Sequence, residues 1–321
     1  MRFFASMERA AEDVAARSRH PDDPERRWFL EALLASSAGA LIGIPDLAEA
    51  KSVDSPLERQ VSRLVKKMRR QGRISASERT SWSVYDFTTR TKLVSINEAV
   101  PRQAASMIKP FVAQAYFYQV DQGRKGARYT SSVRHTMERM IQHSDNRATN
   151  RIIDLVSRHG AGRGPREVEA VLKAAAPNVF KQVRVVEKIP DSGATYANRA
   201  SAWDYSRFLY AMHHGKLPYS EEMRRLMRLP NHDRIFKGVP GIPSSVHVCD
   251  KTGSTAKLCG DMGILEARDR HGRYHAYTMI GIIERQTRAR NYGSWISKRS
   301  DAIREVSNLV YQYMKDRHHL V

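Results

Sequence analysis

The sequence predicts an α+β protein in which an antiparallel β-sheet is flanked by N- and C-terminal helices and carries an inserted all-α part. Three observations predict this class. Strand-like runs lie early and late in the chain, helical patterns lie at both ends, and helical patterns also dominate residues 101–199. In such layered folds, one face of a sheet is buried against helices. The 321 residues, 41% hydrophobic and 27% charged, are typical of a globular protein.

A helix and a hairpin are the first elements that we expect. Residues 53–72 have an apolar stripe at helical spacing, with Ser55 as the cap, Pro56 in the first turn and Gly72 at the end. Next come "SWSVYDF" and "TKLVSIN", two strand-like runs joined by "TTR". Two such runs with a short connection predict a β-hairpin.

The middle of the chain is predicted to be helical. Residues 106–120 form an apolar helical run, residues 132–158 form two helical pieces with a break near Ser144, and residues 165–175 form a further helix. The intervening "GAGRGP" reads as a loop. Its glycines do not predict a dinucleotide site, because a helix and not a strand precedes them. A poorly patterned stretch follows, up to about residue 200.

Strands return near the end of the chain. "SAWDYSRFLYAMHHG" predicts a helix with a capping box at Ser201 and Asp204 and a stop at Gly215. "VHVCDKTG", "CGDMGILEA" and "YHAYTMIGIIE" are strand-like, and a last helix is expected at about 296–316. We therefore expect one domain over 51–321. Its α/β part comprises 51–100 and 200–321, and its helical part comprises 101–199.

The N-terminal segment 1–50 predicts an export signal. Residues 25–50, "ERRWFLEALLASSAGALIGIPDLAEA", begin with paired arginines and end on Ala-Glu-Ala, which fits a cleavage site. The "RRWFL" core resembles the twin-arginine signal and predicts a periplasmic protein. The alternative is an amphipathic N-terminal helix, favoured by the acids before the arginines and by Glu31. The apolar run is too short and too rich in small residues to predict a membrane span.

The formal net charge of +20 predicts attraction to polyanions. Nucleic acid and anionic envelope polymers would both fit. No zinc-finger spacing, basic-leucine heptad or aromatic RNA-binding motif accompanies the charge, so no specific nucleic-acid partner is predicted. The basic residues are scattered, and a solvated basic surface is the simpler interpretation.

Ser106 and Lys109, in "AASMIKPF", are the first residues that could perform chemistry. Residues three apart on a helix are neighbours. A partly desolvated lysine has a lowered pKa and accepts a proton from a serine hydroxyl. A helix that begins near Ser106 would tolerate Pro110 and would place an oxyanion at its N-terminus. Alone, this spacing is common and equally describes an ordinary helical lysine.

Two further motifs follow. "HSDN" places the hydroxyl of Ser144 and the amide of Asn146 at a helix break, with Asp145 expected to hold backbone amides. "DKTGS" lies on a strand-like run. There Lys251 offers a positive charge and Thr252 a hydroxyl for a substrate carboxylate. Gly253 is expected to let a substrate backbone approach the strand, and the amide of Ser254 to pair with that of Ser106 around an oxyanion.

The order S-x-x-K, S-D-N, K-T-G resembles the serine β-lactamases of class A and the penicillin-binding D-Ala-D-Ala peptidases. The lead-in "VYDFTTRTKLVSINEAVPRQAASMIK" and the helix "HSDNRATNRIIDLV" are also similar to those proteins. The resemblance covers about residues 55–318. It implies a β-lactamase/transpeptidase-like fold and an exported serine hydrolase that needs no cofactor or metal.

The resemblance assigns roles to the motif residues. Ser106 is the acylated nucleophile, Lys109 its general base, and Ser144 the proton relay to the leaving nitrogen. Asn146 binds the substrate's side-chain amide. The substrate carboxylate is held by Lys251 and Thr252. The substrates implied are β-lactams or cell-wall peptides of the D-Ala-D-Ala type.

The sequence departs from the class A pattern in two places. The segment between Ser106 and Ser144 is shorter than usual. Class A enzymes also carry a glutamate in an E-x-x-L-N loop that activates the deacylating water, and no such motif is present. The candidates are Glu169, in "EAVLK", and Glu187, in "EKIPD"; Glu169 reads better as a surface residue of a helix.

The missing motif leaves three hypotheses. The first is a hydrolase that turns over β-lactams. The second is a D,D-carboxypeptidase or esterase with poor β-lactam turnover. The third is a catalytically silent module that binds envelope polymers, and the presence of every catalytic motif residue argues against it.

The two cysteines, Cys249 and Cys259, flank the "DKTGST" segment. No metal site can be built from them. Export would allow a disulfide to persist. The sequence leaves a cross-strand disulfide and two buried thiols equally open.

Overall fold

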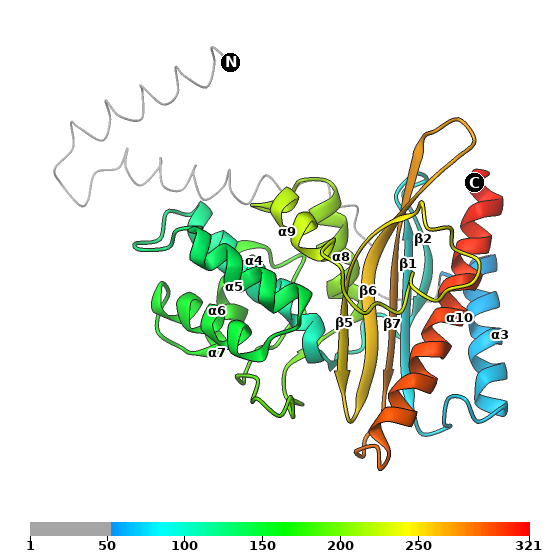
Figure 1. The fold of residues 1–321 in the computed structure, drawn as a ribbon, viewed down its shortest axis with the longest axis horizontal. Helices are drawn as coiled ribbons and strands as arrows, with labels where there is room; N and C mark the ends of the chain where they lie inside the picture. The colour runs from blue at the N-terminus through cyan, green and yellow to red at the C-terminus, as the bar shows by residue number, and fades with distance from the viewer. Residues whose placement is uncertain (1–52) are drawn as a thin grey trace. The chain divides into compact units, whose positions relative to one another are not determined.

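The computed structural model describes residues 53–321, and the predicted export signal lies outside them. Its centre is a 5-stranded antiparallel sheet in the order β2-β1-β7-β6-β5 (Figure 1). The early hairpin supplies one edge and the late strands supply the rest, so the α+β prediction is confirmed. The strands are β1 (Arg79–Asp86), β2 (Thr91–Ile96), β5 (His247–Thr255), β6 (Leu258–Arg268) and β7 (Tyr274–Glu284).

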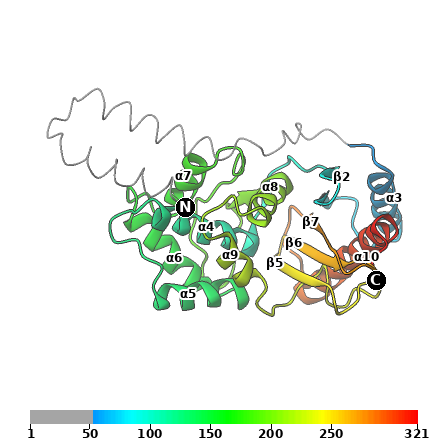
Figure 2. The ribbon, with the colours of Figure 1, turned by 90° about the horizontal axis from the view of Figure 1, so that it is seen from above.

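Helices from the two ends of the described chain cover one face of the sheet. These are α3 (Pro56–Arg70) and α10 (Tyr292–His318), which lie side by side in both views (Figures 1 and 2). As predicted, Ser55 caps α3, its hydroxyl accepting the amide of Glu58 at 3.0 Å. The apolar stripe of α3, Leu57, Val61, Val65 and Met68, is buried against the sheet and α10.

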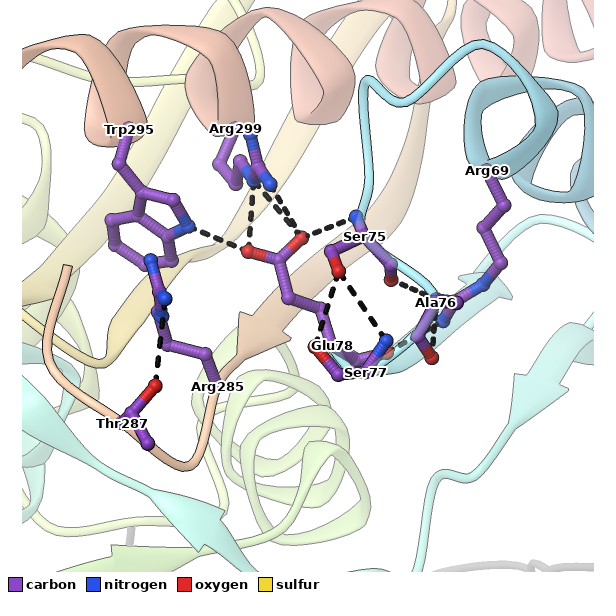
Figure 3. A network of polar contacts seen from close by, with 9 residues as sticks. All are labelled: Arg69, Ser75, Ala76, Ser77, Glu78, Arg285, Thr287, Trp295 and Arg299. Carbon is purple, nitrogen blue, oxygen red and sulfur yellow. Dashed lines mark hydrogen bonds and ion pairs between the residues drawn. The ribbon is translucent and has the colours of Figure 1, made fainter.

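A buried ion pair joins these two ends (Figure 3). Glu78, just before β1, accepts hydrogen bonds from Arg299 at 2.7 Å and from the indole of Trp295 at 2.6 Å. The amide of Ser75 also donates to Glu78, at 2.8 Å. The carboxylate is therefore fully partnered although it is removed from water, which is the condition under which a buried charge is tolerated.

The helical part lies beyond the β5 edge of the sheet (Figure 1). A 3₁₀ turn, η1 (Ala105–Ile108), leads directly into α4, and the expected break near Ser144 separates α5 from α6. Ser144 itself has φ of 55°, a left-handed conformation that ends one helix before the next begins. The helices are α4 (Lys109–Asp121), α5 (Ser131–Gln142), α6 (Asn146–Arg158) and α7 (Pro165–Ala175).

Helix α8 (Ala202–His213) covers the other face of the sheet, with the predicted capping box of Ser201 and Asp204. Helix α9 (Ser220–Met227) was not expected from the sequence, and it packs against α4 and α5. The helical part therefore also contains α9, which comes after residue 199 in the sequence. A short ladder of β3 (Arg102–Gln103) and β4 (Arg199–Ala200) was also not expected.

The disulfide hypothesis is corrected by the strand register. Cys249 lies opposite Ile264 and Cys259 lies opposite Ser254. Because side chains alternate along a strand, Cys249 and Ser254 face opposite sides of the sheet, and so do the two cysteines. Both are buried free thiols. Within residues 53–321, no helix is long and apolar enough to cross a membrane.

Candidate active site

The predicted motif residues meet in a cleft between η1, the start of α6 and strand β5. Ser106 lies on η1, directly after Ala105, whose φ of 46° is left-handed. Such strain at a non-glycine residue costs about 1–3 kcal/mol and is frequent at functional sites. The cleft has a volume of about 260 Å³ and is lined by Ser106, Ser144, Asn146, Ile189, Gly193, Thr195, Thr252 and Ser254.

Lys109 is the first residue of α4, and its side chain is buried. Its amine lies 3.0 Å from the hydroxyl of Ser144 and 3.0 Å from Oδ1 of Asn146, and it also donates to the carbonyl of Ser144. The expected hydrogen bond to Ser106 is not made between the described residues. Ser106 is among the residues that line the cleft.

The electrostatics of Lys109 favour the uncharged amine. Burial, together with the positive charge of Lys251, lowers the pKa of Lys109 to about 6, although Asp145 acts in the opposite direction. An amine that is neutral at pH 7 can accept a proton from a hydroxyl.

The S-D-N motif occupies the start of α6. Asp145 caps that helix by accepting the amide of Ala148 at 2.9 Å, and it pairs with Arg139, as expected of a residue that holds backbone amides. The amide nitrogen of Asn146 reaches the carbonyl of Pro190 at 3.3 Å. Asn146 therefore bridges Lys109 and the loop that closes the cleft.

The K-T-G motif lies on β5. Lys251 is buried and donates to the carbonyl of Thr252 at 3.2 Å. Burial lowers the pKa of Lys251, and the adjacent carboxyls of Asp250 and Asp261 oppose this shift. Lys251 is thus buried next to Asp250 and Asp261 and is not among the residues that line the cleft, whereas Thr252 and Ser254 are.

Gly253 has a different role from the one expected. A Cβ added to Gly253 would lie 3.0 Å from the side chain of Met107 and 3.2 Å from the carbonyl oxygen of Ala104. The missing side chain therefore faces η1 and not the substrate. It lets the turn that carries Ser106 rest directly on β5.

Sequence reasoning missed Arg234. Its guanidinium donates to the hydroxyl of Ser254 at 2.6 Å, to the carbonyl of Gly260 at 2.9 Å and to the hydroxyl of Ser300 at 2.8 Å. Arg234 thereby fixes Ser254 at the rim of the cleft. It lies between α9 and β5 in a stretch without periodicity, so no sequence signal marked it.

Neither Glu169 nor Glu187, the two candidates for the deacylation base, is among the residues that line the cleft. Glu169 is paired with Lys173 at 2.7 Å on α7. One oxygen of Glu187 accepts from Thr195 at 2.5 Å and from the amides of Tyr196 and Ala197 at 2.8 Å. Burial alone would raise the pKa of Glu187, but these hydrogen bonds outweigh it and hold the pKa low. Glu187 holds the loop together.

Ile189 occupies the loop position that faces the cleft. It is buried, and Asn150 holds its backbone from both sides: the amide of Ile189 donates to Oδ1 at 2.9 Å, and its carbonyl accepts from Nδ2 at 2.7 Å. Asn150 lies four residues after Asn146 on α6, so helical spacing could have indicated that both side chains lie on the side of α6 that meets the loop of Ile189 and Pro190. No sequence signal distinguished Ile189.

Comparison with solved structures shows the same fold. The penicillin G acyl-enzyme complex of a PBP-A mutant is 22% identical, with a TM-score of 0.62, and covers 84% of this chain and 100% of its own. A β-lactamase from Desulfarculus baarsii is 16% identical, with a TM-score of 0.63, and covers 80% and 98%. The last common ancestor of Gram-negative bacteria class A β-lactamase is 18% identical, with a TM-score of 0.60, and covers 81% and 100%.

Comparison with curated proteins gives no match. The model of the beta-lactamase enzyme family matches residues 56–128 and 124–314, which together span most of the chain. The motif order, the antiparallel sheet and this match agree, and the chain belongs to the beta-lactamase enzyme family.

Proposed function

We propose that Ser106 is acylated by β-lactams or by cell-wall peptides of the D-Ala-D-Ala type, and that the enzyme releases β-lactam acyl groups slowly. Of the three hypotheses raised by the sequence, this is the penicillin-binding peptidase or esterase with poor β-lactam turnover. One observation carries it: the cleft of Ser106 is lined by Ile189 and, among the described residues, by no carboxylate.

The acylation step uses groups that lie together in the cleft. Ser106 Oγ attacks the carbonyl carbon as its proton passes to the uncharged amine of Lys109, and the carbonyl oxygen becomes an oxyanion between the amides of Ser106 and Ser254. The amine of Lys109 lies 3.0 Å from Ser144 Oγ. The proton therefore continues through Ser144 to the departing nitrogen as the carbon–nitrogen bond breaks.

Deacylation requires a base that removes a proton from water next to the acyl ester. General bases contribute about 10²- to 10⁴-fold to such steps. Glu187 is occupied by three hydrogen bonds, and Ile189 cannot accept a proton. A hydrolase with fast β-lactam turnover is therefore less well supported than an enzyme that is trapped as the acyl ester. The fold neighbour PBP-A, as a mutant, has been captured as such an ester with penicillin G.

Incubation with a fluorescent penicillin, followed by intact-mass measurement over time, tests this proposal. We expect a stoichiometric adduct on Ser106 that persists well beyond the time of its formation, and no adduct in Ser106→Ala. Rapid turnover without accumulation would instead support a β-lactamase. If the wild-type protein forms no adduct at all, acyl transfer to Ser106 is wrong.

Export remains a proposal that rests on the paired arginines, Arg26 and Arg27. Replacing both with lysine would keep the charge but remove the twin-arginine signal. In a bacterial host, we expect this variant to stay in the cytoplasm, as judged by fractionation. Unchanged export would show that the segment does not act as this signal.

Binding of anionic envelope polymers is favoured by one feature of α6. A cavity of about 410 Å³ on this helix is lined by Arg147, Arg151 and Arg158, and also by Asn150, Leu155 and Asp154, of which Asp154 is paired with Lys188 at 2.7 Å. Clustered arginines attract polyanions, and the attraction weakens as salt screens it. We expect immobilised lipoteichoic acid to retain the protein at low salt, and Arg151→Gln with Arg158→Gln to weaken retention. Retention that is insensitive to salt and to both changes would exclude this role.

A further inference from the structure

A second cavity continues the catalytic cleft. Its volume is about 550 Å³, and it shares Asn146, Gly193 and Ser254 with the cleft of Ser106. It extends past the end of β5 to the connection between β7 and α10, where Arg288 and Tyr292 line it. Cavities of this size hold a substantial part of a small-molecule ligand.

Two cations without carboxylate partners among the described residues contact Tyr196, a residue of this cavity; Arg288 also lines the cavity, and Lys257 follows the lining residue Ala256. The ammonium of Lys257 is 5.0 Å from the ring centre of Tyr196, and the guanidinium of Arg288 is 5.9 Å from the same ring. Tyr196 and Arg288 both line the cavity. Neither Lys257 nor Arg288 forms an ion pair with any residue in 53–321. The local charge is therefore positive and open to a ligand.

Asp191, the one carboxylate among the described residues that line the cavity, does not offset this charge. Asp191 is bound by Arg147, with nitrogen–oxygen distances of 2.8 and 3.2 Å. The guanidinium of Arg147 also holds the pKa of Asp191 below its usual range. Asp191 is thus an ionised carboxylate that already has its own cation.

The backbone around the two cations is fixed in place. The amide of Ala289 donates to the carbonyl of Ala256, and the amide of Arg285 donates to the carbonyl of Lys257, both at 2.8 Å. The guanidinium of Arg285 lies 5.8 Å from the ring centre of Trp295, whose indole is held by Glu78 (Figure 3). The chain segments that carry Lys257 and Arg288 are therefore braced against each other and against α10.

We propose that this second cavity binds an anionic extension of the acyl donor, with Lys257 and Arg288 as the residues that select it. The inference rests on the proposed acylation of Ser106. The substrate carboxylate of the leaving half is assigned to Thr252, which lines the cleft of Ser106, whereas Asn146 is assigned to the amide of the acyl half. Because the cavity begins at Asn146 and leads away from Ser106, it receives the part of the acyl chain beyond that amide.

A matched pair of penicillins tests the inference. One is 6-aminopenicillanic acid acylated by one end of adipic acid, and the other is the methyl ester of its free side-chain carboxyl. The two differ only in the distal charge. We expect the acid to acylate Ser106 about fivefold faster at low salt, since partly exposed ion pairs contribute on this scale. The ratio should fall toward one as salt is added.

Charge-removing variants test whether the difference between the two acylation rates arises in this cavity. Arg288→Gln and Lys257→Gln should each lower the ratio of the two acylation rates, and the double variant should bring it near one. Arg270→Gln removes the same charge at an exposed position of the β6–β7 turn and should keep the wild-type ratio.

Three results would overturn the inference. Equal rates for both probes on a wild-type protein that does form the Ser106 adduct would overturn the anionic site alone. An equal fall of the ratio in all three single variants would assign the preference to net charge and not to the cavity. Absence of an adduct with either probe would overturn the proposed function, and this inference with it.

Discussion

At the scale of single residues, the site depends on a lysine that has lost its charge. Lys109 is the first residue of the largely buried helix α4, and its amine donates hydrogen bonds to oxygens of Ser144 and Asn146. Burial is the main cause of its lowered pKa. An exposed lysine at the same sequence spacing would remain an ammonium ion and could not accept a proton at neutral pH.

The pKa of about 6 for Lys109 predicts the pH dependence of acylation. The uncharged amine is the competent form, so the acylation rate should be low below this pKa, rise through it and level off above it. Stopped-flow measurement with a chromogenic cephalosporin checks this. Lys109→Arg keeps a permanent charge and should lower the plateau about 10²-fold or more. A wild-type rate that rises only above pH 9 would contradict a depressed pKa.

Ile189 predicts the fate of the acyl-enzyme. Ile189→Glu places a carboxylate beside the ester and should shorten the lifetime of the penicillin adduct about tenfold or more, because a general base becomes available to water. Ile189→Gln has nearly the same shape without the base, and its adduct should keep a long lifetime. Time-resolved intact-mass spectra distinguish the two. Equal lifetimes in both variants would show that a different group limits deacylation.

At the scale of elements, the turn η1 is positioned by glycines on the sheet. Gly253 on β5 lies against the backbone and side chains of residues 104–107, and Gly260 on β6 lies against the far end of Met107. The sheet thus carries the nucleophile directly, without an intervening layer of side chains. A small displacement of a catalytic group has a large effect on rate, since an error of about 1 Å can cost about 10²-fold.

Two substitutions test the contacts of Gly253 and Gly260 with η1 one at a time. Gly253→Ala would bring a Cβ to 3.2 Å from the carbonyl oxygen of Ala104, which cannot move without moving Ser106. We expect acylation to fall about tenfold with the fold retained. Gly260→Ala meets the flexible end of Met107 at 2.7 Å and should cost less, because methionine readily changes rotamer. Equal rate losses in the two variants would mean that η1 is not held by the close approach at Gly253.

At the scale of the whole described molecule, the two chain ends are joined by ion pairs of different burial. Glu78 and Arg299 are nearly inaccessible, with side-chain exposures of 2% and 9%. Arg73 and Glu305 join the same region at 2.5 Å but remain 38% and 36% exposed. Removing one partner of a buried pair leaves an uncompensated charge, whereas an exposed pair is replaced by water.

This difference in burial predicts that Glu78→Gln and Glu305→Gln lower the free energy of unfolding by different amounts. Glu78→Gln should lower the free energy of unfolding by about 3 kcal/mol or more, because Arg299 stays buried without its counterion. Glu305→Gln should lower it by less than about 1 kcal/mol. Urea denaturation followed by tryptophan fluorescence measures both. Similar losses would show that the buried pair does not hold the two ends together more strongly than the exposed one.

The sequence by itself determined the fold class, the paired strands and the terminal helices, because these follow from local periodicity and caps. It also determined the order of the motifs that carry Ser106, Ser144 and Thr252. The sequence did not predict the short elements β3, β4 and α9, because they are stabilised by pairing or packing with distant segments and not by local propensity.

Only the tertiary structure decided what surrounds the nucleophile. Strand register placed the two cysteines on opposite faces of the sheet, and loop contacts turned Glu187 into a structural residue. Hydrogen bonds with Asn150 hold Ile189 at the cleft, and the chain connection after β7 brings Arg288 to the second cavity. Each of these depends on contacts between residues far apart in the sequence. A motif names the residue types that can react, but long-range packing decides which neighbours they meet.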